Sequence, residues 1–88
     1  MISNTLFLQN EVGLHARPAS LFAKTAQKYN ASITVSCNGK KVNAKSILSI
    51  LSLGAIKNSE ITISVEGEDS QTAMNALQQL VINKFGEK

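Results

Sequence analysis

The 88-residue chain has no tryptophan and only one histidine, one cysteine and one proline. Because a disulfide needs two cysteines, an internal one is excluded, which is typical of a protein from a reducing compartment. His15 and Cys37 are separated by two expected elements and are too few ligands for a zinc site. The N-terminus does not resemble a signal peptide, and no apolar run is long enough to span a bilayer. These absences predict a cytoplasmic protein with no membrane insertion and no metal site. We also expect no cofactor.

Charged residues are also few, at 17% of the chain, whereas hydrophobic residues make up 43%. This balance excludes a disordered chain and predicts one domain over residues 1–88. The formal net charge is +3, with most bases in the first half and several acids late in the chain. The asymmetry predicts a positive face that suits an acidic partner. A set of lysines that are merely solvated explains it equally well.

Aromatic residues make up only 5% of the chain, which argues against a nucleic-acid-binding module. Such a module is the main rival interpretation, because small basic α+β domains often bind RNA. The expected strands offer no paired aromatic side chains for base stacking, and no GxxG loop is present. We therefore expect no nucleic-acid partner.

Apolar residues alternate with polar ones in three segments, which predicts strands around residues 5–8, 33–37 and 61–65. The dipeptide Asn38-Gly39 favours a two-residue hairpin turn, because both turn positions need a positive φ. A further strand is therefore expected around residues 40–43. The clearest strands have a single apolar parity, so we expect a sheet that is covered on one face only.

Three helices are expected between and after these strands. The first is amphipathic, begins at His15 or Ala16 and runs for about three turns. The second is short and follows Ser46, a favoured N-cap residue. The third is capped by Asp69 or Ser70 and ends at Gly86, with Ala73, Leu77, Leu80, Val81 and Lys84 along one stripe. The order βαββαβα predicts an α+β fold in which helices pack on one side of an antiparallel sheet.

The stretch GLHARPAS, from Gly13 to Ser20, places the only histidine at the junction between a loop and a helix. The free amides of the helix N-terminus and the Arg17 guanidinium would form an anion site around the His15 ring. A nucleophilic nitrogen inside an anion site suits transient capture of a phosphoryl group. Gly13 is expected to leave the approach open. The alternative is that His15 serves only as a helix cap with an arginine nearby by chance; a Ser/His/acid triad lacks a positioned acid.

The chain resembles the HPr family, the histidine-containing phosphocarriers of the bacterial phosphoenolpyruvate:sugar phosphotransferase system. The resemblance covers essentially the whole chain and rests on three stretches: GLHARPAS, NGKKVNAKSILSILSLG and EITISVEGED. It implies an open-faced β-sandwich, with a four-stranded antiparallel sheet in the order 1-4-2-3 and three helices on one side.

The same resemblance implies a role for each residue of the first stretch. His15 would accept a phosphoryl group on Nδ1 from Enzyme I, which takes it from phosphoenolpyruvate, and pass it to the IIA component of a sugar permease. Arg17 would compensate the charge of the phosphate. The protein would be a monomeric carrier with a transient phosphohistidine rather than an enzyme with steady turnover. The Mg²⁺ requirement would belong to Enzyme I.

Ser46 has two interpretations. Its position before a helix is fully explained by N-capping. Family members in many Gram-positive bacteria carry a regulatory phosphate at this place, which implies an HPr kinase/phosphorylase and a catabolite-control regulator as further partners. The residue is compatible with both.

The helix after Ser46 also predicts a docking patch. Around that helix, Ile47, Ile50 and Leu51 form one stripe that we expect to be buried, while Leu48 points away. An exposed leucine near the histidine loop could contact a partner. The family resemblance adds Ile47 and Leu51 to the same surface. The predicted docking surface comprises Ala16, Ser20, Lys24, Lys45, Ile47, Leu48 and Leu51.

Two paralogues are considered beside the general sugar carrier. A regulator without carrier activity would lack the histidine, and His15 is present. A carrier of a nitrogen-linked or fructose-specific branch would share every catalytic residue. The permeases determine which sugars are transported, so the sequence of this chain does not predict those sugars.

Overall fold

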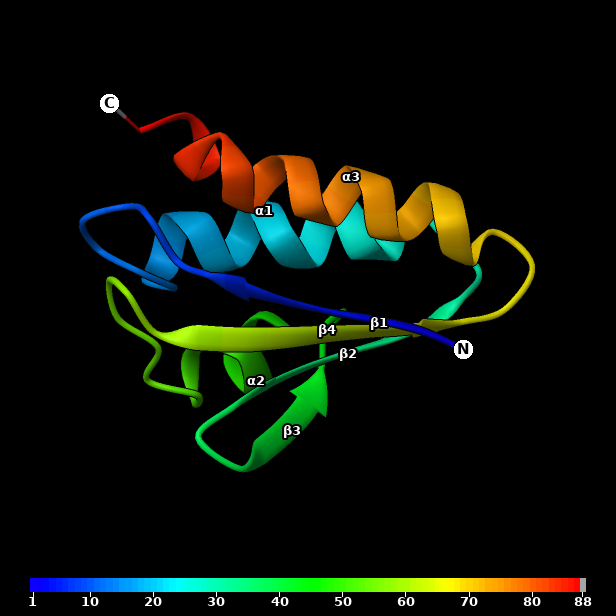
Figure 1. The fold of residues 1–88 in the computed structure, drawn as a ribbon, viewed down its shortest axis with the longest axis horizontal. Helices are drawn as coiled ribbons and strands as arrows, with labels where there is room; N and C mark the ends of the chain where they lie inside the picture. The colour runs from blue at the N-terminus through cyan, green and yellow to red at the C-terminus, as the bar shows by residue number, and fades with distance from the viewer. Residues whose placement is uncertain (88) are drawn as a thin grey trace.

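Four strands form one antiparallel sheet in the order β1-β4-β2-β3, as predicted. The structure is a computed structural model that describes residues 1–87. Its elements are β1 (Ile2–Phe7), α1 (Ala16–Gln27), β2 (Ser32–Cys37), β3 (Lys40–Asn43), α2 (Ile47–Leu51), β4 (Glu60–Glu66), α3 (Ser70–Ile82) and a short 3₁₀ turn, η1 (Lys84–Gly86). This is the βαββαβα order of an open-faced sandwich, and Figure 1 shows α1 and α3 side by side along the sheet.

The sheet has one buried face and one exposed face, because its apolar residues share one parity. In β4, Ile61, Ile63 and Val65 are fully buried, while Thr62 and Ser64, which alternate with them, are only half-buried. The hairpin between β2 and β3 turns at Asn38 and Gly39, whose φ angles are +53° and +83°. The predicted two-residue turn is therefore confirmed.

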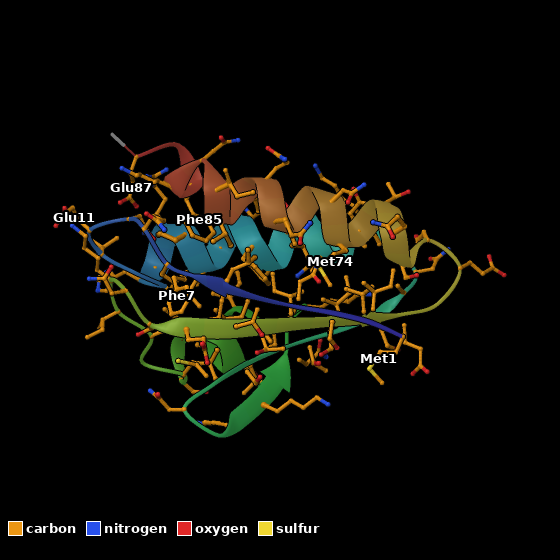
Figure 2. All side chains as sticks on the ribbon, in the orientation of Figure 1. Met1, Phe7, Glu11, Met74, Phe85 and Glu87 are labelled. Atoms are coloured by element: carbon orange, nitrogen blue, oxygen red, sulfur yellow. The ribbon has the colours of Figure 1, made fainter. Side chains whose placement is uncertain are left out.

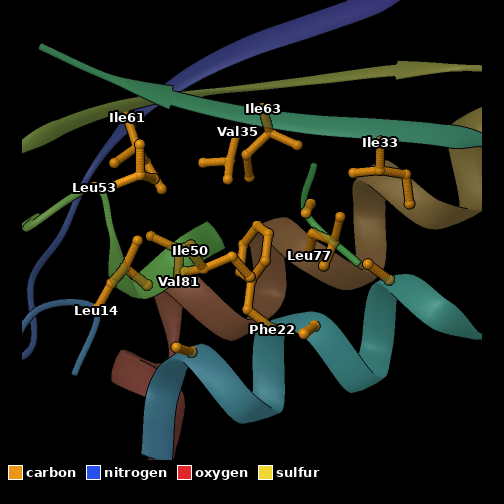
Figure 3. Close-up of a cluster of buried hydrophobic side chains, with 14 of the residues drawn as sticks. Leu14, Phe22, Ile33, Val35, Ile50, Leu53, Ile61, Ile63, Leu77 and Val81 are labelled. Carbon is orange, nitrogen blue, oxygen red and sulfur yellow. The ribbon is translucent and has the colours of Figure 1, made fainter. Parts of the chain in front are cut away.

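The core lies between this buried face and the helices. Figure 3 shows side chains of β2 and β4 pointing toward Phe22 of α1 and Leu77 of α3, with Ile50 of α2 at the side. Phe22 is completely buried. Burying a side chain of this size contributes roughly 1.5–3 kcal/mol, so this aromatic ring is a main anchor of α1 on the sheet. None of the helices in residues 1–87 combines the length and apolarity that a membrane crossing requires.

The end of the last helix differs from the prediction. The helical stripe was expected to include Lys84 and to end at Gly86, but α3 ends at Ile82. Lys84 and Phe85 both have left-handed backbones, with φ of +55° and +54°. This turn brings Phe85 back into the core, where it is 2% exposed. The helical spacing was misleading because burial of the aromatic ring offsets the cost of a backbone that leaves the helix.

Asp69 occupies the N-cap position of α3, but its side chain makes no capping bond. Its carboxylate instead accepts hydrogen bonds from the backbone amides of Asn30 and Ala31, both at 2.9 Å. The bond from Asn30 is the main cause that lowers the pKa of Asp69. Asp69 therefore ties the connection between α1 and β2 to the start of α3, a contact that the capping prediction did not include.

Candidate functional site

His15 is the N-cap residue of α1, with an extended backbone of φ −80° and ψ −172°. Its backbone oxygen accepts the first intrahelical bond, from the Ala19 amide at 2.9 Å. Its side chain makes no capping hydrogen bond and is exposed. The structure therefore does not support the alternative in which the imidazole serves to cap the helix. As the N-cap, His15 directly precedes the amide groups that a helix leaves free in its first turn.

The segment that leads to it, the His15 loop (residues 9–15), is packed against residues 55–57. Gly13 has φ of +60°, and a Cβ there would lie 2.5 Å from the Ala55 oxygen and 2.6 Å from the Ile56 Cα. The Leu14 amide donates to the same Ala55 oxygen at 3.0 Å. Gly13 was expected to open the approach to the imidazole, but it is buried. Its lack of a side chain instead permits the close contact with residues 55 and 56.

Arg17 lies in the first turn of α1 and is directed toward the C-terminal segment (residues 83–87). Its Nη2 lies 3.4 Å from Glu87 Oε2, and its Nη1 donates to the Phe85 oxygen at 3.4 Å. Figure 2 places Phe85 and Glu87 near the end of the chain, beside the helix pair. The side chain of Arg17 remains 59% exposed. Both contacts are long and the guanidinium is largely exposed, so they hold it only weakly.

The predicted docking surface is divided by the structure into exposed and half-buried residues. Leu48 is 80% exposed, as predicted for a residue that points away from the core. Ile47 and Leu51 were expected to be buried, but they are only half-buried, because the five-residue α2 buries Ile50 alone. Ala16 and Lys24 are exposed, while Ser20 and Lys45 are half-buried. Helices α1 and α2 pack against each other, so these residues lie on neighbouring elements.

Lys45 already has a partner within the protein. Its ammonium donates to the Tyr29 oxygen at 2.7 Å, just beyond the end of α1. The Lys45 backbone oxygen in turn accepts from the Gln27 side-chain Nε2 at 2.9 Å. A cation near the last carbonyl groups of a helix is favourable, because the helix dipole is negative there. An acidic partner would therefore compete with an internal hydrogen bond for this residue.

Ser46 is confirmed as the N-cap of α2. Its Oγ accepts a hydrogen bond from the Ser49 amide at 3.3 Å, and its backbone is extended. The hydroxyl thus satisfies one of the amide groups that the short helix leaves free.

Sequence reasoning missed several residues around His15. Glu87 holds Arg17 through a contact between distant parts of the chain. Asn10, within the His15 loop, is almost completely buried. Val12 and Ile56 are exposed apolar side chains, 49% and 68% exposed, next to the contact between Gly13 and residue 56. No local pattern marks these residues, because each depends on how loops pack.

Electrostatic contacts add a further link between the two loops. The Lys57 ammonium lies 2.7 Å from Glu11 Oε1. This hydrogen bond is the main cause that lowers the pKa of Glu11. Both side chains are exposed, so the pair orients the loops more than it stabilises the fold. Among residues 1–87, no three His, Cys, Asp or Glu side chains are grouped so that they could hold a metal ion.

Comparisons with known proteins agree with this geometry. Residues 2–83 match the family model described as "PTS HPr component phosphorylation site". A phosphocarrier protein HPr from Xylella fastidiosa (strain 9a5c) is 39% identical over 87 residues, which cover 99% of this chain and 98% of that protein. The crystal structure of HPr-C-His from Thermoanaerobacter tengcongensis is 46% identical and covers 100% of this chain and 99% of its own, with a TM-score of 0.97. A crystal structure of an HPr dimer from the same organism is 47% identical, with a TM-score of 0.80, and covers 99% of this chain and 100% of its own.

Proposed function

Because this chain belongs to the HPr family, the phosphocarriers of the phosphotransferase system, we propose that His15 is the residue that carries its phosphoryl group. One observation supports this assignment above the others. The imidazole of His15 is exposed at the N-terminus of α1 and is not used to cap that helix. A ring nitrogen is therefore free to react, and the adjacent amide groups favour an anion.

The transfer has two steps, and each step forms one bond to phosphorus and breaks another. Nδ1 of an unprotonated His15 attacks phosphorus, and a P–N bond forms while the bond between phosphorus and the donor breaks. The electron pair of the broken bond leaves with the donor. In the next step an acceptor attacks the same phosphorus, and the electron pair of the P–N bond returns to the His15 ring.

Arg17 is proposed to compensate the charge of the bound phosphoryl group. Its guanidinium is 59% exposed and makes two contacts of 3.4 Å, to Glu87 and to the Phe85 oxygen. A phosphate oxygen close to α1 offers a shorter, charge-assisted hydrogen bond. A planar guanidinium can bind two such oxygens at once, so it is well suited to exchange Glu87 for the phosphate.

The donor is proposed to be Enzyme I, and the acceptors are IIA components of sugar permeases. Both would dock on Ala16, Ser20, Lys24, Lys45, Ile47, Leu48 and Leu51. The support for this surface is the 80% exposed Leu48 on a helix that packs against α1. The net charge of +3 suits acidic partner surfaces, which would accelerate association.

Ser46 is proposed as a second, regulatory phosphorylation site for an HPr kinase/phosphorylase, read by a catabolite-control regulator. The support is its half-buried position next to Ile47 and Leu48. A phosphate would add nearly two negative charges beside the docking surface. It would repel an acidic partner while α2 tolerates it, because negative charge is favourable at a helix N-terminus.

The remaining parts of the proposal concern the whole chain. We infer one cytoplasmic domain over residues 1–88, of which Lys88 lies outside the described residues, and a monomer as the active form. Sedimentation of the purified protein tests the monomer directly, which matters because an HPr dimer has been crystallised from Thermoanaerobacter tengcongensis.

The deciding experiment is incubation with Enzyme I, phosphoenolpyruvate and Mg²⁺, followed by intact mass measurement. The expected result is one added phosphoryl group that is lost in acid and stable in alkali, as a phosphoramidate is. The His15→Ala variant should gain none. An alanine variant that still gains one acid-labile group would overturn the assignment.

A further inference from the structure

Asn10 is a polar residue in an unusual place, because its side chain is only 1% exposed. Asparagine is mostly found at the surface, and a buried amide destabilises the fold unless it is hydrogen-bonded. Asn10 lies three residues before Gly13, within the His15 loop, and its contacts lead to both functional residues of the site.

The first contact is with Gly13. The Asn10 side-chain Nδ2 donates to the Gly13 oxygen at 2.7 Å, and the Asn10 backbone oxygen accepts from the Gly13 amide at 3.3 Å. Both backbone polar groups of Gly13 are thus held by one residue. Because Gly13 also has a left-handed backbone pressed against Ala55 and Ile56, its orientation is tightly restricted. That orientation sets the path of Leu14 and then of His15.

The second contact is with Glu87. The same Asn10 Nδ2 lies 3.4 Å from Glu87 Oε2, and this oxygen lies 3.4 Å from Arg17 Nη2. One amide group therefore contacts the backbone that leads to His15 and the carboxylate that holds Arg17. The Oδ1 atom of Asn10 is also buried and accepts no hydrogen bond from residues 1–87. The polar contacts of this amide are made by its donor nitrogen.

We propose that Asn10 is a positioning residue for phosphoryl transfer. Through Gly13 it fixes the backbone that leads to the His15 imidazole, and through Glu87 it favours, by longer contacts, one resting place of Arg17 before the phosphoryl group arrives. The inference rests on the proposed role of His15. It adds that the reactive geometry depends on one buried amide that contacts neither the phosphoryl group nor a partner.

The test compares Asn10→Ala and Asn10→Leu with the wild type. Asn4→Ala is the matched control, because Asn4 also donates from its amide, to Gln78 on α3, away from the His15 loop. Phosphorylation by Enzyme I is followed at a temperature well below the melting point of every variant. We expect kcat to fall by about tenfold or more, because small displacements of reacting groups are costly. KM for this protein should stay within about twofold, because the docking residues are untouched.

A second measurement reports on the loop without any transfer. The Leu14 amide, bonded to the Ala55 oxygen, should exchange its hydrogen about tenfold faster in the Asn10 variants and at the wild-type rate in Asn4→Ala. If both Asn10 variants fail to fold, Glu87→Gln carries the test. It should change kcat through Arg17 while Leu14 exchange stays as in the wild type.

The outcomes separate this inference from the proposed function. If the wild type itself gains no phosphoryl group, the role of His15 fails. If the wild type is phosphorylated and folded Asn10→Leu keeps both its kcat and its Leu14 exchange rate, Asn10 is a structural residue and the positioning role is wrong. Where only Glu87→Gln can be studied, an unchanged kcat overturns the part of the positioning role that runs through Arg17.

Discussion

The two helix starts that carry the proposed phosphorylation sites use their N-cap side chains in opposite ways. At α1, His15 contributes only its backbone oxygen to the helix, and its ring is exposed. At α2, the Ser46 hydroxyl accepts a bond from the Ser49 amide and is half-buried. The His15 side chain is therefore free to react, whereas the Ser46 side chain is engaged in capping its helix. A twelve-residue helix held by a buried Phe22 does not depend on its cap, whereas a five-residue helix gains much more from one.

The largest effect expected from this comparison is at His15. Replacing His15 with alanine should abolish phosphoryl acceptance and change the free energy of unfolding by no more than ~0.5 kcal/mol, because the ring caps nothing. Intact mass and a chemical denaturation curve measure the two effects. A loss of about 1 kcal/mol would mean that the imidazole stabilises the helix start after all, and the contrast with Ser46 would disappear.

Arg17 is expected to give the next largest effect. Arg17→Ala should slow phosphoryl transfer by about 10²-fold, which is typical when one charged donor to a transition state is removed. Its stability should change by no more than ~0.5 kcal/mol, because its contacts are long and its side chain is 59% exposed. Rapid-quench kinetics measure the rate.

Lys28→Ala is the matched control for Arg17, since it removes an exposed cation from the other end of α1. It should leave the transfer rate close to that of the wild type. Arg17→Lys keeps the charge but not the planar fork, so its rate should lie between those of the wild type and the alanine variant. A Lys28 variant that slows transfer as much as Arg17→Ala would show that net charge, not the position of the guanidinium, matters.

The contrast between Arg17 and the strands shows what the sequence could predict. The strand segments, the turn at Asn38 and the start of α1 follow from local patterns of apolar residues and turn residues, and all three were confirmed. The order of the strands in the sheet was implied only by the family resemblance, and it was confirmed too. The surroundings of Arg17 could not be predicted, because its contact with Phe85 joins residues 68 positions apart. That contact exists only because two successive residues with left-handed backbones redirect the chain after α3.

The sequence predicted which residues belong to the candidate site, but not how their side chains are arranged. His15 and Ser46 were singled out as helix caps from residue type and position, and both are N-caps in the structure. Asn10 was missed because a single asparagine in a loop does not reveal its burial. Lys45 was expected to be open to partners, and its bond to the Tyr29 oxygen depends on how α1 and α2 pack.

At Ser46 two variants separate structure from regulation. Ser46→Ala should lower the free energy of unfolding by about 1 kcal/mol, because the cap is lost, while His15 still accepts a phosphoryl group. Ser46→Asp keeps a good cap and adds a charge, so its melting temperature should be unchanged or slightly higher. Its phosphorylation by Enzyme I should be slower, because the new charge lies beside Leu48.

Ser36→Asp is the charge control for this pair, since Ser36 lies on β2, away from α2. It should leave the Enzyme I reaction nearly unchanged. If Ser46→Asp accepts phosphate as fast as the wild type at low salt, Ser46 is a structural cap only. The two helix starts would then differ in purpose as well as in geometry.

The smallest effect under ordinary conditions is expected at the third helix start, where Asp69 binds the amides of Asn30 and Ala31 instead of its own helix. Those bonds lower the pKa of Asp69 in the folded protein. Its stabilising contribution is therefore complete above the pKa of an unfolded aspartate and is lost as the pH falls through the lower, folded value. Asp69→Asn keeps one acceptor oxygen but turns an NH₂ group toward the second amide. The variant should melt below the wild type at pH 7, and the difference in melting temperature should shrink steadily in acid.

Glu68→Gln, which alters the adjacent exposed carboxylate, is the control and should show no such convergence. A difference between wild type and Asp69→Asn that stays constant from pH 7 into acid would mean that the carboxylate charge at this helix start does not stabilise the fold, and that Asp69 acts through its shape alone.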